Sequence, residues 1–375
     1  MRRILATAAA FLMTTAAFAQ TIDTKALDTK TAADLLPQAK QEGKVTVYAF
    51  TSRIGRVEKA FEAAYRGIDM VTFDMSSTEQ IARIKSEAQA GLAGADVIYI
   101  SDAPVVLTEL LANKLIAPYV PPRVAGDLAD GFKSPLLAQR LSTKVLMYNE
   151  EAHPGGAPVK NLWDLTKPEW KGRVIMVDPL QRGDYLDLMT EIVLKSDEMA
   201  TAYEAAFGKA VELTDGNENA GQQFITDLFG NDLVLVGSTD DVNKAIGAKG
   251  QDKPPIGFTS YSDRRDNEDE GWALQVANDV APANGIVFPA LLALNPKPAS
   301  PAAARLAVDF MMGDETENGG DGFKPFYVAG DWATRSDIKP HKDAIPLADF
   351  KGWQMAPAET AKIRAEVADF ILALQ

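Results

Sequence analysis

Short runs of β-branched and aromatic residues alternate along this chain with stretches of helical periodicity. Lys44 to Phe50 predicts a strand, and the spacing of Ile54, Val57, Phe61 and Tyr65 predicts a helix directly after it, capped by Thr51 or Ser52. The pattern repeats with a strand over 70–73, a capping-box helix from Ser76, and a strand over 97–100. Such alternation predicts an α/β fold in which most strands are parallel.

A second set of the same kind follows. It comprises expected strands over 143–148, 173–177 and 232–236, with helices from Asp184 and through 222–229. Further strands over 272–276 and 285–294 and helices over 302–312 and 360–374 complete the chain. Two similar sets indicate two lobes.

The first residues indicate export from the cytoplasm. Arg2 and Arg3 precede an apolar run, and Ala17-Phe18-Ala19 has the small-residue pattern of a cleavage site, so residues 1–19 are expected to be a signal peptide. With no cysteine, the chain has no lipid anchor of the kind attached to an exported cysteine. We therefore predict a free periplasmic protein. Its net charge of −14 argues against a nucleic-acid partner.

Hydroxyl, amide and carboxylate side chains recur where strands turn into helices. In open α/β sheets such turns lie at the carboxyl edge of the sheet, where helix N-termini favour anions. Each residue type is also a common helix cap, so capping alone is the alternative interpretation. The predicted ligand-binding residues are Ser52, Ser77, Thr78, Ser101, Arg182, Gly183, Asp184, Asn219, Thr239 and Asp240.

Motifs for catalysis and for metal or nucleotide binding are missing from the sequence. The two histidines, His153 and His341, lie in loop-like sequence without partners for a catalytic triad or a multi-histidine metal site. No glycine-rich nucleotide loop or nucleophile elbow occurs. The sequence thus predicts no enzyme, no cofactor and no bound metal, and it favours a binding protein.

Several segments in a fixed order resemble periplasmic solute-binding proteins of ABC importers, in the branch of the ferric-ion and hexose-phosphate binding proteins. The matching segments are Val45-Thr46-Val47-Tyr48, Ser76 to Gln80 with Ile84 to Glu87, Ala95 to Tyr99, Leu115 to Tyr119, Val145 to Asn149, Asn161 to Leu165, and Pro168 to Arg173. The resemblance implies a two-lobed type II fold with a ligand cleft between the lobes. It places lobe 1 at residues 20–141 and 272–375, with C-terminal helices that pack on both lobes, and lobe 2 at 142–271. It also implies a monomer that delivers its solute to a membrane permease.

The resemblance does not carry over the iron site. Ferric members hold the ion with a consecutive tyrosine pair, where this sequence has Thr239-Asp240, and their histidine and glutamate fall at about Ser52 and Ser101. Similarity to the hexose-phosphate binders implies that Asp240, with Asp241 or Asp184, accepts hydrogen bonds from sugar hydroxyls. It also implies that Ser77, Thr78, Arg182 and Gly183 hold an anionic group.

Three hypotheses for function follow from these observations. The first is a receptor for a small anionic, hydroxylated solute such as a sugar phosphate. The second keeps the fold but binds ferric iron through Asp240, Tyr185 or Tyr148. The third is an exported enzyme that uses Asp184 and Asp240 as an acid and base pair.

Overall fold

The structure is a computed structural model that describes residues 24–375, so the expected signal peptide at 1–19 lies outside the described residues. It contains eleven strands: β1 Lys44–Ala49, β2 Asp69–Asp74, β3 Val97–Ile100, β4 Leu137–Asn149, β5 Val174–Val177, β6 Val234–Val236, β7 Ile256–Thr259, β8 Leu274–Val276, β9 Gly285–Leu294, β10 Trp332–Ala333 and β11 Trp353–Gln354.

Helices follow most of these strands, as the alternating sequence pattern predicts. They are α1 Ala32–Glu42, α2 Ile54–Ala64, α3 Ser77–Ala90, α4 Ala103–Val105, α5 Asp130–Lys133, α6 Gly183–Leu194, α7 Ser196–Phe207, α8 Ala220–Gly230, α9 Thr239–Gly247, α10 Asn267–Glu270, α11 Pro301–Met311, α12 Gly320–Phe323 and α13 Pro357–Leu374. No helix in the described part of the chain is long and apolar enough to span a membrane.

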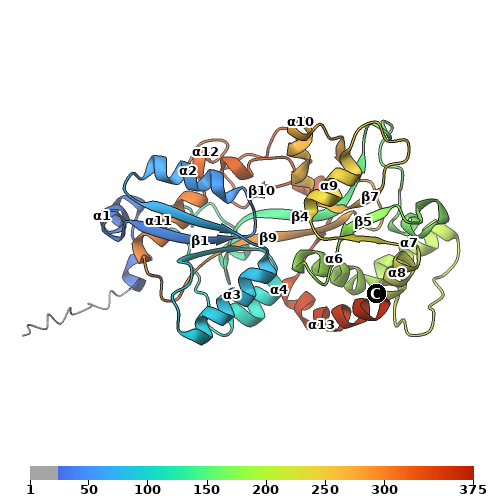
Figure 1. Cartoon of the computed structure of the whole chain (residues 1–375), viewed down its shortest axis with the longest axis horizontal. Coiled ribbons are helices and arrows are strands. Elements are labelled where there is room, and N and C mark those ends of the chain that lie inside the picture. Colours follow the sequence, from blue (N-terminus) through green and yellow to red (C-terminus); the bar gives the residue numbers. More distant parts are fainter. Residues whose placement is uncertain (1–23) are drawn as a thin grey trace, which may run out of the picture.

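The strands form one sheet in the order β2-β1-β3-β9-β4-β7-β5-β6. Pairing is parallel on both flanks, among β1, β2 and β3 and among β5, β6 and β7. The central pairs, β3 with β9, β9 with β4, and β4 with β7, are antiparallel. The sheet therefore consists of two parallel α/β units, which we call lobe 1 (built on β1–β3) and lobe 2 (built on β5–β7). Figure 1 shows β4 and β9 running between them.

The two long strands join the lobes. β4 pairs with β9 from Leu137 to Val145, and its last residues pair with β7 and β8. Every residue of β4 is buried, because β4 is the inner strand that belongs to both lobes. The lobe boundaries expected at residues 141/142 and 271/272 stay a prediction.

Local capping explains where several helices begin. Ser76 and Glu79 form the predicted capping box of α3, with each side chain hydrogen-bonded to the backbone N–H of the other residue. The expected cap of α2 by Thr51 or Ser52 is wrong. Arg53 occupies the N-cap position without a side-chain cap, and Thr51 Oγ1 accepts from the Arg53 backbone instead. This leaves Ser52 exposed at the start of the helix.

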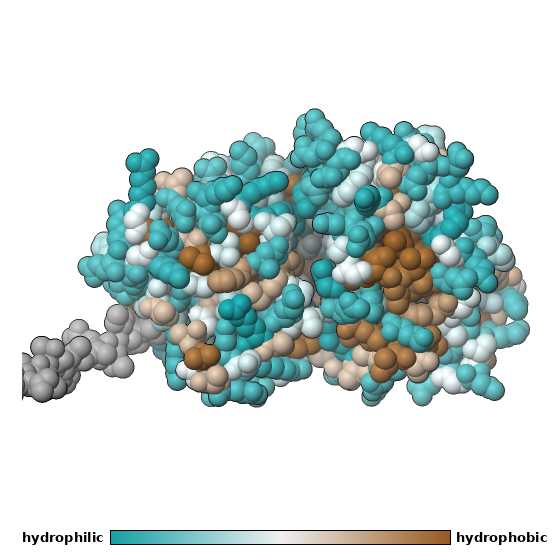
Figure 2. Space-filling model, in the orientation of Figure 1, coloured by the Kyte–Doolittle hydropathy of each residue, from teal (hydrophilic) through white to brown (hydrophobic). Residues whose placement is uncertain are grey.

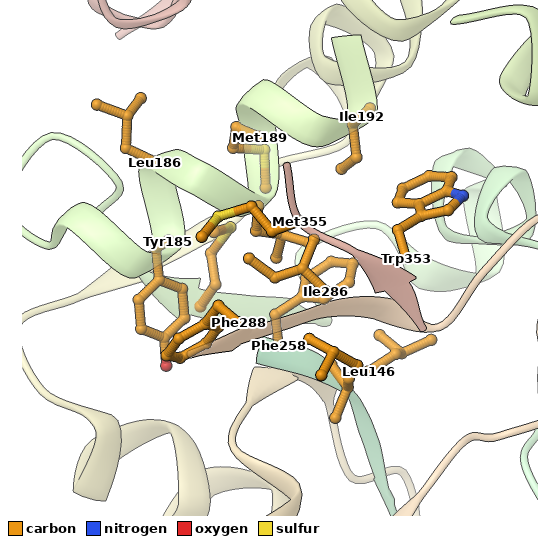
Figure 3. Close-up of a cluster of buried hydrophobic side chains, with 14 of the residues drawn as sticks. Leu146, Tyr185, Leu186, Met189, Ile192, Phe258, Ile286, Phe288, Trp353 and Met355 are labelled. Atoms are coloured by element: carbon orange, nitrogen blue, oxygen red, sulfur yellow. The ribbon is translucent and has the colours of Figure 1, made fainter. Parts of the chain in front are cut away.

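Two groups of buried apolar side chains hold the sheet between its helices. One packs β1 and β3 against α1, α2 and α11, with Val47, Phe61 and Leu306 at its centre. The other runs from the side of lobe 1 covered by α3, where it includes Ile84, into lobe 2, where it includes Trp163 and Phe224. In Figure 3, α6 lays Tyr185 beside Phe288 of β9, which fixes α6 against the strands that join the lobes. Figure 2 shows a mainly hydrophilic surface with apolar side chains gathered on the half that carries α6 and α8.

Candidate ligand-binding site

A polar cavity of about 290 Å³ lies between the lobes at the carboxyl ends of the parallel strands. The segment after β1 contributes Phe50 to Arg53, and β2 ends in Asp74. Lobe 2 contributes Arg182 and Asp184 after β5, Ser238 to Asp240 after β6, and residues after β7. The cavity thus lies where ligands bind in open α/β folds, and both lobes line it.

The floor of the cavity is β4. Arg140, Ser142 and Lys144 all line it, because side chains two residues apart on a strand point to the same face. Ser142 pairs with Phe288 of β9, which also lines the cavity. Two fully buried cations on one strand are unusual in a core, where lysine and arginine are almost never buried unless they are paired.

The lobe 1 side holds a buried cluster of two arginines and one carboxylate. Asp331, which precedes β10, places Oδ2 at 2.6 Å from Arg53 Nη1 and 3.1 Å from Arg140 Nε. Burial raises the pKa of Asp331, but Arg140 and Arg53 outweigh it, so the pKa lies below its usual value. Burial lowers the pKa of Arg140 to about 9, which still leaves it charged at neutral pH. Two cations on one carboxylate give this cluster one surplus positive charge.

The lobe 2 side holds a second cluster of the same composition. Asp184 Oδ2 lies 3.1 Å from Lys144 Nζ and 3.3 Å from Arg182 Nη2. Burial raises the pKa of Asp184, yet Arg182 and Lys144 bring it down to about 2. Lys144 also donates to Ser260 Oγ at 2.7 Å. This cluster too has one surplus positive charge, so two positive centres face the cavity, and the carboxylates of Asp74 and Asp240 line it as well.

Hydroxyl groups and a third ion pair complete the lining. Five serines and two threonines line the cavity: Ser52, Ser142, Ser238, Ser260, Ser262, Thr51 and Thr239. On the segment after β7, Arg265 Nη1 lies 2.7 Å from Asp263 Oδ1, and Asn243 donates to Asp263 Oδ2. The hydroxyls can donate or accept hydrogen bonds, which suits a solute with hydroxyl groups.

Half of the ten predicted residues line this cavity: Ser52, Arg182, Asp184, Thr239 and Asp240. Their role in binding stays a prediction. Gly183 lies between two of them at the start of α6, and a β-carbon there would overlap the carboxylate of Asp102. Its position therefore reflects close packing between the lobes.

Four other predicted residues lie elsewhere. Ser77 and Ser101 are buried and hydrogen-bonded to each other, with 2.8 Å between their Oγ atoms. Thr78 is exposed on the first turn of α3. Asn219 caps α8 by accepting from the N–H of Gln222. None of the four lines the cavity.

The iron hypothesis depends on Asp240, Tyr148 or Tyr185, and the enzyme hypothesis depends on Asp184 and Asp240. Tyr148 and Tyr185 do not line the cavity, and burial together with Asp184 raises the pKa of Tyr185, which disfavours the phenolate that binds iron. Among residues 24–375, no three histidine, cysteine or acidic side chains are grouped to hold a metal. Asp184 and Asp240 both line the cavity, but a pKa of about 2 makes Asp184 a poor acid or base at neutral pH.

The sequence reasoning missed the cations of the floor. Lys144 falls inside the expected strand over 143–148, but Arg140 lies before it, because the observed strand begins six residues earlier, at Leu137. Charged residues inside a buried strand indicate either a paired core charge or a binding site. Arg53 and Asp331 are 278 residues apart in the sequence, and no local pattern connects them.

A family model of bacterial extracellular solute-binding proteins matches residues 45–318 of this chain. Because the match covers well over half of the sequence, the protein belongs to this family. This confirms the resemblance found in the sequence. Comparison with curated proteins finds no significant match.

Solved structures of periplasmic binding proteins share the fold. Iron-bound HitA from Pseudomonas aeruginosa is 18% identical with a TM-score of 0.67, over 88% of this chain and 99% of that one. AfuA from Actinobacillus pleuropneumoniae, with fructose-6-phosphate bound, is 17% identical with a TM-score of 0.65, over 88% and 97% of the chains. A substrate-binding protein of an ABC transporter from Agrobacterium tumefaciens is 13% identical with a TM-score of 0.66, over 88% and 94%. These similarities confirm the two-lobed type II fold.

Proposed function

We propose that this protein is the periplasmic receptor of an ABC importer and that it captures a small solute with both an acidic group and hydroxyl groups, such as a sugar phosphate. The observation that carries the proposal is the pair of buried clusters, in each of which two cations share one carboxylate at the same cavity. A phosphate ester could bind at these two clusters, while Asp74 and Asp240, which line the same cavity, accept hydrogen bonds from the hydroxyl groups of the solute.

The remaining lining supports the hydroxylated part of the solute. Asp184 Oδ1 is buried and has no hydrogen-bond partner among the described residues, so it is free to accept from a ligand hydroxyl. Asp240 and the surrounding serines and threonines add further acceptors and donors. The resemblance to the hexose-phosphate binders points to the same class of solute.

The position of the cavity supports closure of the lobes around the solute. Lobe 1 supplies Arg53, lobe 2 supplies Arg182, and β4 lies between them. A solute that contacts both lobes stabilises the arrangement in which they are close together, and this closed form is what the permease would receive.

A thermal-shift comparison tests the proposal with four probes: fructose 6-phosphate, fructose, inorganic phosphate and ferric citrate. A ligand present at one hundred times its Kd stabilises the folded protein by about 2.7 kcal/mol. We expect fructose 6-phosphate to raise the melting temperature more than fructose or phosphate alone. A shift with ferric citrate only would support the iron hypothesis and overturn ours, and an equal shift with fructose would remove the role of the cations.

A further inference from the structure

The C-terminal helix lies against both lobes. α13 packs on α6 and α8 of lobe 2 and on α4, which follows β3 of lobe 1. Figure 1 shows it below the sheet, running from α4 toward α8. A helix in this position can transmit a change in one lobe to the other, provided that specific side chains tie it to each.

One side chain of this helix makes such ties to three residues in two segments, one in each lobe. Arg364 Nη2 lies 2.9 Å from Asp102 Oδ1 and donates to the carbonyl oxygen of Gly183 at 3.3 Å. Its Nε donates to Asp187 Oδ1 at 2.7 Å. Asp102 follows β3 in lobe 1, whereas Gly183 and Asp187 belong to α6 in lobe 2. A single guanidinium therefore bridges the lobes.

The surroundings show that this contact is closely fitted. The side chains of Asp102 and Asp187 are each 2% exposed, and that of Arg364 is 16% exposed. Asp102 adopts a left-handed backbone with φ of 62°, which directs the chain from β3 into α4. Gly183 has no side chain because the Asp102 carboxylate and Arg364 Nη2 occupy the space of its β-carbon.

The same turn of α6 carries two residues of the candidate site. Arg182 and Asp184 flank Gly183 and line the cavity. The N-cap residue of α6, Arg182, makes no side-chain capping hydrogen bond to the helix, so capping does not hold the first turn in place. Arg364 holds this turn by donating to the carbonyl oxygen of Gly183 and to the carboxylate of Asp187, directly beside and one turn after the lining residues.

We propose that Arg364 is a positioning residue of the ligand site, which holds the first turn of α6 against the segment after β3 so that Arg182 and Asp184 face the cavity. The inference rests on the proposed function for its effect on binding. The structural part of the inference, that Arg364 fixes the first turn of α6 across the lobes, does not depend on which ligand binds in the cavity.

The test compares Arg364→Gln with Lys362→Gln, which removes one charge from the exposed face of the same helix, where Lys362 forms an ion pair with Glu359. Affinity for fructose 6-phosphate is measured by calorimetry in the wild-type and in the Arg182→Ala background. We expect Arg364→Gln to raise the Kd at least 10-fold in the wild-type background and less than 3-fold in the Arg182→Ala background, with no change for Lys362→Gln. An unchanged Kd, or an equal loss in both backgrounds, would overturn the proposal.

Hydrogen exchange separates this proposal from the proposed function. Without any ligand, the amides of residues 184–187 should exchange at least 10-fold faster in Arg364→Gln than in the wild type, while those of α3 keep their rates. If the wild type binds none of the probes but this exchange increases, the proposed function fails and the positioning role stands. If the wild type binds and the exchange rates are equal, the positioning role fails.

Discussion

Asp184 and Asp331 have matching environments on opposite sides of one cavity. Each is buried, each uses Oδ2 to contact two cations, and the Oδ1 of each has no hydrogen-bond partner among residues 24–375. The difference is depth, since Asp184 lines the cavity and Asp331 lies behind Arg53 and Arg140. We therefore expect substitutions at Asp331 to act on stability and those near Asp184 to act on binding.

Asp331→Asn should strongly destabilise the fold. The change keeps the volume of the side chain but leaves Arg53 and Arg140 buried without their shared counter-charge, and removing one partner of a buried ion pair costs about 3–5 kcal/mol. Urea denaturation measures the loss. The control is Glu317→Gln, which removes an exposed partner of Lys339 and should leave the transition unchanged. Equal midpoints for Asp331→Asn and the wild type would contradict the account of this cluster.

Arg182→Ala should reduce affinity for a phosphorylated solute far more than for its unphosphorylated form. A hydrogen bond to a charged group contributes about 1.5–3 kcal/mol, so the Kd for fructose 6-phosphate should rise roughly 10- to 100-fold. Calorimetric titration with fructose 6-phosphate and with fructose makes the comparison. If both affinities fall by the same factor, Arg182 does not contact the acidic group.

Gly183→Ala should destabilise the protein by about 1–3 kcal/mol, because the added methyl group overlaps the buried carboxylate of Asp102. Gly55→Ala is the matched control. Gly55 lies in α2 with open space around its β-carbon position, so alanine there should stabilise the protein by about 0.4–1 kcal/mol. Urea denaturation of both variants checks the two signs. A neutral Gly183→Ala would show that the lobes are not in contact at this turn.

The stability difference between the wild type and Asp102→Asn should depend on pH. Burial raises the pKa of Asp102 to about 6, despite the lowering effect of Arg364, whereas the unfolded value is 3.8. A raised pKa means that the folded state holds the proton more tightly, so its stabilising contribution is complete below pH 3.8 and is lost as pH rises through 6.

Lowering the pH from 7.5 to 4.5 should therefore stabilise the wild type relative to Asp102→Asn, with each unit of pKa difference equivalent to about 1.4 kcal/mol. Urea denaturation of both proteins at several pH values measures this difference. A difference that stays constant, or that changes in the opposite direction, would show that Asp102 is not buried as described.

Sequence periodicity was sufficient for the α/β class, because long strands and helices such as β9 and α3 carry their own apolar patterns and caps. The same periodicity did not predict the short elements. β7 has four residues including Gly257, and β10 and β11 have two residues each, so they form only because neighbouring strands supply their partners. Elements of two to four residues are too short to show a periodic pattern of apolar residues in the sequence.

The candidate site was predictable where it depends on chain direction and not where it depends on distant contacts. The turns after β5 and β6 lie together because these strands are parallel. The turn after β1 faces them, because the three antiparallel pairs between β3 and β7 make the parallel strands of the two lobes run toward each other. The turn after β3 meets α6 and α13 instead, because Asp102 bonds to Arg364, 262 residues further along the chain. Periodicity contains no information about such a partner.

The arrangement of Arg140, Ser142 and Lys144 on one strand has a kinetic consequence. The pleat of β4 sets the distances between these side chains, so their spacing does not depend on the angle between the lobes. If the lobes open and close around a solute as proposed, these groups keep their spacing throughout the motion. Under that proposal we expect the charge of a solute to be selected at β4 before the lobes close.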